Sequence, residues 1–250
     1  MNSDINNNTI ATLIKSNPEF EEVIQHLIKN FNKSTSVFIH ELRNPLTIMK
    51  SMIQYIEMQH PETKDYKYWD QLQCLAMDME NIMSDISTLN ICNCIKKQEC
   101  NFLSLIEEVV NNFRPQANSQ QKDLKLIISE ENKSYYFLYS CDSPKIKQVL
   151  SNLIKNAMEA TSPGDYIHII LDYLPDDDNS GSQLCIKVAN NGIPIPEKEI
   201  KTIFNPFITY KQGGTGIGLA VAEKIVNLHY GSISVTSSEE ETCFTILLPR

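Results

Sequence analysis

Residues 213–226 read GGTGIGLAVAEKIV, a glycine-rich loop that runs directly into an apolar helical pattern. Glycines let a ligand approach the backbone closely, and a helix N-terminus favours negative charge. The stretch therefore predicts an anion-binding turn. Its spacing, Gly214-x-Gly216-x-Gly218, differs from the G-x-G-x-x-G of a dinucleotide fold, and no Gly-Lys-Ser/Thr loop occurs in the chain. The turn alone therefore does not identify the fold, and the surrounding sequence must be considered.

A second helical pattern, QVLSNLIKNAMEA, covers residues 148–160 and carries two asparagines four residues apart. Asn152 and Asn156 share one face of this helix, and its apolar residues would face a sheet. Amide side chains can hold phosphate, or a hard cation through the oxygen. The alternative is that both asparagines only decorate the surface.

Segments of strand type surround these two helices. They are rich in Ile, Tyr, Val and Leu and lie at 124–129, 135–141, 166–174, 184–190, 232–236 and 243–248. Helical patterns cover 102–113, 144–161, 197–204 and 217–229, and Asp142 or Ser143 is the expected N-cap of the second, with Pro144 in its first turn. The charged loop at 175–182 reads as a solvated hairpin turn. This half predicts an α+β fold, a two-layer sandwich with helices on one face of a sheet.

The N-terminal half has a different period. From Pro18 a long helical pattern carries an apolar heptad seam at Phe20, Ile24, Leu27, Phe31, Phe38, Leu42, Met49, Ile53 and Ile56. Pro45 should bend this helix, and the polar stretch around Pro61 predicts the turn of a hairpin. A second seam follows at Trp69, Leu72, Ala76, Met79, Met83, Ile86 and Leu89.

Two helices cannot enclose a core alone, but two copies of a hairpin can, as an antiparallel four-helix bundle. The sequence therefore predicts a homodimer. The alternative is that both helices pack on the rest of the same chain. The expected division is a polar tail at 1–17, a helical hairpin at 18–95 and the α+β domain at 96–250.

Composition limits the partners and the compartment. The 250 residues include 22 Lys+Arg and 31 Asp+Glu, a net charge of −9, which argues against a nucleic-acid binder. No window approaches 18 uninterrupted apolar residues, and the Asn-rich N-terminus lacks the layout of a signal peptide, so no membrane span and a cytoplasmic location are expected. Seven cysteines without a C-x-x-C pair read as reduced thiols.

His40 lies on the first helix, two positions after Phe38, so it should point away from the seam into solvent. The following residue is Glu41, and a carboxylate can orient one ring nitrogen and leave the other nucleophilic. The pair also opens the zinc motif H-E-x-x-H, but Asn44 stands at its last position, so that reading fails. The alternative is an exposed histidine without a function.

Taken together, the chain resembles the bacterial sensor histidine kinases of two-component signalling, from about residue 30 to its end. Five motifs carry the resemblance in the family's order: HELRNPL at 40–46, NLIKN at 152–156, NNGIPIP at 190–196, FNPF at 204–207 and GTGIGL at 214–219. The family implies a dimerisation and phosphotransfer hairpin, followed by a catalytic domain of the type shared with Hsp90, gyrase and MutL.

The resemblance implies a phosphoacceptor and a nucleotide site. His40 would accept the phosphoryl group, Glu41 would be its orienting base, and Asn44 matches the position linked to dephosphorylation of the partner, the receiver domain of a response regulator. Asn156 matches the Mg²⁺ ligand. The remaining residues that the resemblance assigns to ATP are Asn152, Asn190, Gly192, Lys211, Gly214, Thr215, Gly216, Gly218 and Leu219.

Two residues depart from the family pattern. Asn190 stands where the family usually has an aspartate that accepts a hydrogen bond from the adenine amine, and Pro194 replaces a glycine. A neutral acceptor in place of a charged one predicts ATP affinity lower by very roughly tenfold. The structural alternative for Asn190 is that it only caps a turn.

Two other functions stay open. One is a phosphorelay histidine phosphotransferase whose ATP domain is degenerate, which the two departures favour. The other is a module that sequesters another protein, as anti-sigma factors do, against which the intact phosphoacceptor motif argues.

Overall fold

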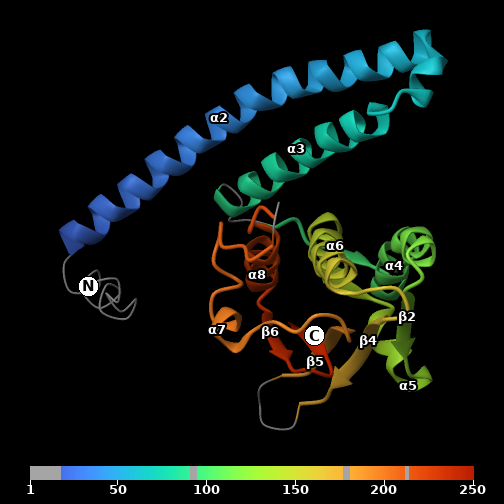
Figure 1. Cartoon of the computed structure of the whole chain (residues 1–250). Helices are drawn as coiled ribbons and strands as arrows, with labels where there is room; N and C mark the ends of the chain where they lie inside the picture. Colours follow the sequence, from blue (N-terminus) through green and yellow to red (C-terminus); the bar gives the residue numbers. More distant parts are fainter. Residues whose placement is uncertain (1–17, 91–94, 177–180, 212–213) are drawn as a thin grey trace. The chain divides into compact units, whose positions relative to one another are not determined.

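The computed structural model describes residues 18–90, 95–176, 181–211 and 214–250. The chain splits into two compact units, Met1–Ile91 and Cys92–Arg250 (Figure 1). The expected tail at 1–17 and the middle of the loop at 175–182 lie outside the described residues. Within the described part, no helix combines the length and the apolar character that a bilayer crossing needs.

The first unit is the predicted helical hairpin. Helix α2 covers Pro18–Gln59, a short 3-10 helix η1 covers Pro61–Asp65, and α3 covers Trp69–Asn90. The turn at Pro61 agrees with the sequence prediction, and α2 is helical from Pro18, the first described residue. Helix α2 continues through Pro45 as one ribbon (Figure 1), so the proline does not end it.

The apolar contact between α2 and α3 differs from the predicted seam on α2. The buried residues are Ile39, Leu46 and Ile53, each seven residues from the next, and on α3 Ala76 and Met83. Of the predicted α2 seam only Ile53 is among them, whereas Leu27, Phe31, Phe38, Leu42, Met49 and Ile56 are exposed; the side chains of Phe20 and Ile24 lie outside the described part. Helix α2 is apolar on two neighbouring faces, and periodicity alone does not say which face packs within the hairpin.

The second unit is built on a five-stranded sheet in the order β2-β4-β5-β7-β6. Its strands are β2 Asp123–Ile128, β4 Tyr166–Leu174, β5 Gln183–Asn190, β6 Ser232–Ser237 and β7 Thr242–Pro249. The β2–β4 pair is parallel and the other pairs are antiparallel. Two short strands, β1 Gln98–Cys100 and β3 Tyr139–Cys141, pair separately.

Three long helices cover one face of this sheet (Figure 1). They are α4 Phe102–Ser119, α6 Ser143–Ala160 and α8 Gly218–Leu228, and a one-turn helix α7 covers Glu197–Ile200. On β5 the alternate residues Leu184, Ile186 and Val188 are fully buried, while Lys187 pairs with Asp172 at 3.0 Å on the other face. This is the two-layer α+β arrangement that the sequence predicts.

Two local predictions were wrong. Only Tyr139–Cys141 of the predicted strand 135–141 is extended, because a short helix α5 (Glu130–Lys133) and a 3-10 turn η2 (Ser134–Tyr136) precede it. The buried Tyr136 hydroxyl lies 2.7 Å from the Asp172 carbonyl and 2.9 Å from that of Cys185, a long-range contact that fixes this turn. The helix predicted at 197–204 ends at Ile200.

Helix α6 is fixed at its start by Asp142, the predicted N-cap. Its Oδ1 accepts from the Lys145 N–H at 3.3 Å, and its Oδ2 accepts from the Lys96 N–H at 2.9 Å. The Asp142 N–H donates to Nε2 of the fully buried His229 at 3.0 Å, and His229 Nδ1 donates to the Ile225 carbonyl at 2.8 Å. Burial lowers the pKa of His229, so this ring stays neutral and joins the start of α6 to the end of α8.

Candidate functional site

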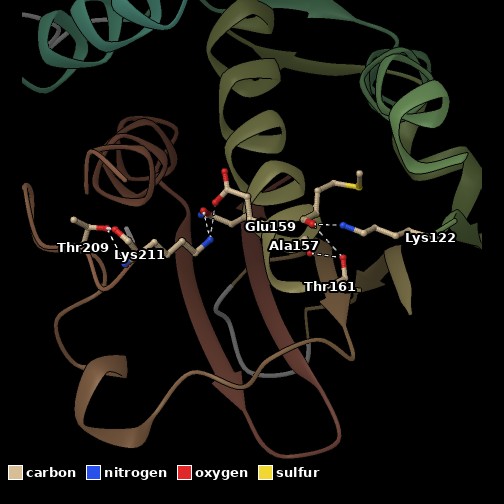
Figure 2. Close-up of polar contacts among 8 residues, drawn as sticks. Lys122, Ala157, Glu159, Thr161, Thr209 and Lys211 are labelled. Atoms are coloured by element: carbon tan, nitrogen blue, oxygen red, sulfur yellow. Dashed lines mark hydrogen bonds and ion pairs between the residues drawn. The ribbon is translucent and has the colours of Figure 1, made fainter. Parts of the chain in front are cut away.

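Helix α6 positions both predicted asparagines. Its buried face, which includes Leu150, Leu153 and Ile154, packs on the sheet, and Asn152 and Asn156 are half-buried at the rim of that face. At the C-terminal end of the helix the Lys122 ammonium donates to the Met158 carbonyl at 2.6 Å (Figure 2). Because α6 is anchored at both ends, the two amides are held on a rigid element.

Asn152 connects α6 to the motif GTGIGL at 214–219. Its Nδ2 donates to the Gly218 carbonyl at 2.9 Å, at the first residue of α8. No side chain caps α8 at Ile217, so no described side chain competes at this N-terminus with an anion. The contact brings Asn152, Gly218 and the neighbouring Leu219 together, as the resemblance implies, and gives Asn152 a role in holding the helix start.

Lys211 reaches from the glycine-rich loop to α6 (Figure 2). Its ammonium donates to the Glu159 carboxylate at 2.8 Å and to Asn156 Oδ1 at 3.3 Å. The structure therefore joins two predicted residues, Lys211 and Asn156, and adds Glu159, which the sequence analysis missed. Its position three residues after Asn156, on the same helix face, was the available signal.

The loop between α7 and α8 needs its glycines for space. A Cβ on Gly216 would lie 2.6 Å from the Ile208 carbonyl oxygen, and its φ of +66° is in the left-handed region. A Cβ on Gly214 would lie 2.6 Å from Thr209 Oγ1. The Phe207 N–H donates to the Gly216 carbonyl at 3.0 Å. The loop thus folds back on itself with bare backbone at both glycines, and Thr215 between them is exposed.

The motif NNGIPIP at 190–196 packs against the C-terminal end of α6. A Cβ on Gly192 would lie 2.2 Å from the Ala160 carbonyl oxygen, and the Ile193 N–H donates to the same oxygen at 2.9 Å. Gly192 is therefore required for the end of β5 to reach the end of α6. Asn190, two residues earlier, is only 2% exposed, and its Nδ2 has no hydrogen-bond partner.

The predicted phosphoacceptor residues lie in the other unit, on α2. His40, Glu41 and Asn44 are all exposed, and the preceding Ile39 is buried against α3. His40 is exposed, as predicted, although the Phe38 seam from which that prediction started is not the packed face. Among the described residues, these three side chains have no hydrogen-bond partner, so Glu41 does not orient the His40 ring in this conformation. Adjacent helix residues do not face each other.

Comparisons with known proteins agree with this geometry. Residues 141–250 match the family model of the histidine kinase-, DNA gyrase B- and HSP90-like ATPase. The catalytic domain of histidine kinase ThkA is 33% identical, covers 62% of this chain and is itself covered over 96% of its length, with a TM-score of 0.53.

The chain belongs to the sensor histidine kinase family.

Among curated family members, sporulation kinase A of Bacillus subtilis (strain 168) is 35% identical over 214 residues, which is 84% of this chain and 33% of the relative. Sporulation kinase E of the same organism is 30% identical over 212 residues, 84% of this chain and 27% of the relative. This family member therefore spans about a third or less of these two relatives. Full-length ShkA, in complex with AMPPNP, shares the fold at 17% identity over 87% of this chain and 45% of its own, with a TM-score of 0.71.

Lys211 offers a direct test of the loop's role in this family member. The Lys211–Glu159 pair is half-exposed, so it contributes about 0–1 kcal/mol to folding. We expect Lys211→Met to leave the melting temperature nearly unchanged. We expect it to weaken Mg·ATP binding by about 1.5–3 kcal/mol, the value of a charge-assisted hydrogen bond. Calorimetric titration and thermal melting measure the two effects. Unchanged affinity with a lower melting temperature would make Lys211 a structural tether only.

Proposed function

We propose that this chain is an ATP-dependent protein histidine kinase (EC 2.7.13.3) that autophosphorylates on His40. The observation that carries the proposal is the approach of Lys211 and Gly218 to the two asparagines of α6, within the segment that matches the ATPase model. An exposed His-Glu pair on a separate helical hairpin supplies the acceptor.

The residues around α6 fit a nucleotide with a divalent cation. Bare backbone at Gly214 and Gly216 and the uncapped start of α8 suit phosphate oxygens. Asn156 Oδ1 accepts a hydrogen bond from the Lys211 ammonium, so this oxygen already faces a positively charged group, and amide oxygens are ligands that Mg²⁺ accepts. Asn156 would hold Mg²⁺, and the ion would neutralise charge on the phosphates.

In the proposed reaction a ring nitrogen of His40 attacks the γ-phosphorus of ATP. A nitrogen–phosphorus bond forms, the bond to the β,γ-bridging oxygen breaks, and ADP leaves. Glu41, once its side chain has turned toward the ring, receives the proton from the opposite ring nitrogen. The protein's contribution is positioning and charge neutralisation, which dominate phosphoryl transfer. The nitrogen–phosphorus bond then breaks as the phosphoryl group passes to an aspartate in the receiver domain of a response regulator. Asn44 would act in the later dephosphorylation of that regulator, in which water hydrolyses the aspartyl phosphate.

Homodimerisation belongs to the proposal. Predicted seam residues on α2 and α3 remain exposed in the single chain, among them Phe38, Leu42, Leu72 and Met79. Large apolar side chains in a contiguous exposed patch mark an interaction surface. A second hairpin packed on this face would complete a four-helix bundle, in which each copy contributes one helix that carries His40.

The alternative of a phosphotransferase with a degenerate ATP domain is supported by one observation, the neutral Asn190 at a buried position. Incubation of the full chain with Mg·ATP labelled at the γ-phosphate separates the functions. A kinase gains an acid-labile, alkali-stable label. A phosphotransferase gains label only from a phosphorylated donor, and a sequestering module gains none.

Glu41 is expected to affect the rate and not the binding. Glu41→Ala should slow autophosphorylation by about 10²–10⁴-fold if the carboxylate is the base. Affinity for Mg·ATP should stay constant, because Glu41 lies on α2 and not in the nucleotide-binding unit. Rapid-quench labelling and calorimetry measure the two quantities. An unchanged labelling rate would remove Glu41 from the mechanism.

A further inference from the structure

Asn190 is the last residue of β5, and its side chain lies on the face of the sheet that the helices cover. Its register partners are Ile167 on β4 and Thr242 on β7, both buried. In an antiparallel register, paired residues point to the same face. Asn190 therefore continues the buried row of Ile186 and Val188, but with a polar side chain.

No hydrogen bond within the fold engages the amide nitrogen of Asn190. Its Nδ2 is buried without a hydrogen-bond partner, and its neighbour Thr242 is engaged with Ser237, at 2.6 Å between hydroxyl oxygens. The next residue differs: Asn191 accepts from the Tyr166 N–H at 2.7 Å and donates to Asp165 at 3.2 Å. A buried unpaired amide destabilises the fold by about the desolvation cost of one polar group. Such a group in a native protein calls for a partner that the chain does not supply, which a water or a ligand can provide.

An amide can satisfy two kinds of purine edge. Adenine presents a 6-amino donor beside the N1 acceptor, whereas guanine and hypoxanthine present a 6-oxo acceptor beside an N1–H donor. Rotation of the amide by 180° exchanges its donor and acceptor, so one asparagine pairs with either edge. A carboxylate only accepts, so it would pair with the 6-amino group and repel the 6-oxo group.

We propose that Asn190 makes the nucleotide site of this chain tolerant of 6-oxopurines, so that it binds inosine and guanine nucleotides as well as adenine nucleotides. This rests on the proposed function, because it takes Asn190 to face the base of the nucleotide. Beyond that function, we infer that Asn190 determines which purine bases the site accepts.

The test compares ADP with IDP, which differ at the 6-position and N1 and cannot support phosphoryl transfer to His40. Calorimetric titration of the full chain with each, in Mg²⁺, should give affinities within about tenfold of each other. In Asn190→Asp the ratio should shift toward ADP by about tenfold or more, the discrimination of a matched against a mismatched base contact. Asn227→Asp is the matched control, since it adds the same charge at an exposed position of α8 and should keep the wild-type ratio.

The outcomes separate this inference from the proposed function. A wild-type preference for ADP above about a hundredfold overturns the inference but not the proposal of a nucleotide site. This measurement needs no variant, so it does not depend on whether Asn190→Asp folds. A ratio unchanged in folded Asn190→Asp also overturns it. Binding of neither nucleotide overturns the nucleotide site itself, and the inference with it. Asn190→Ala should weaken both nucleotides alike.

Discussion

Replacement of His40 by glutamine is expected to abolish the acid-labile label that the protein gains from Mg·ATP. Glutamine is of similar size but has no ring nitrogen able to form a nitrogen–phosphorus bond. Because His40 is exposed and makes no described hydrogen bond, the variant should keep its helicity and its melting temperature. The label is measured by gel autoradiography after acid and alkali treatment, and the fold by circular dichroism.

A second histidine on the same helix provides the control. His26 is also exposed on α2, where its ring Nδ1 lies 3.2 Å from the Asn30 amide nitrogen. His26→Gln should be labelled at the wild-type rate. Label that persists in His40→Gln, or that is lost equally in both variants, would contradict the assignment of His40 as the acceptor. ADP affinity should be unchanged in both, since neither residue lies in the nucleotide-binding unit.

Leu72→Asp is expected to dissociate the proposed homodimer. Leu72 is 41% exposed in the single chain and shares one face of α3 with Leu75 and Met79. In a four-helix bundle this face would be covered, so each copy would bury a carboxylate without a partner. The effective cost is several kcal/mol per charge, and a dimer contains two. The dimer dissociation constant should therefore rise by about a thousandfold or more, as measured by sedimentation equilibrium.

Met77→Asp is the matched variant for this experiment. Met77 is also exposed and apolar, at 55%, but it lies off the three- and four-residue spacing that joins Leu72 and Met79. It should remain dimeric. A wild-type chain that sediments as a folded monomer would refute the bundle, and equal effects of the two aspartates would show that the interface lies elsewhere.

Local signals in the sequence predicted the fold well at helix ends, where a single residue determines the backbone conformation. Pro61 follows the end of α2, and Asp142 caps α6, because their effects act within one turn. The prediction at 135–141 was wrong because Tyr136 is fixed by carbonyls on β4 and β5, far along the chain. Propensity carries no information about such partners.

The same distinction holds for the site. The helix period predicts that Asn152 and Asn156 share a face, but their approach to the glycine-rich loop followed only from the family resemblance. In the structure Asn152 contacts Gly218 and Asn156 contacts Lys211. The unpaired amide of Asn190 and the ammonium–carboxylate contact of Glu159 were not predictable, because both depend on three-dimensional neighbours. On α2 the period predicted a single seam, most of which is exposed, and only the packing of Ile39 and Leu46 identified the inner face.

Asp142 has a mechanical consequence. One carboxylate oxygen caps α6, and the other holds the chain at Lys96, the segment through which the catalytic unit is entered from the hairpin. A pull or twist applied along this segment is therefore delivered first to the cap of the helix that carries Asn152 and Asn156, and through His229 to the end of α8. The Asp142 carboxylate and backbone thus join the segment at Lys96 to the start of α6 and, through His229, to the end of α8.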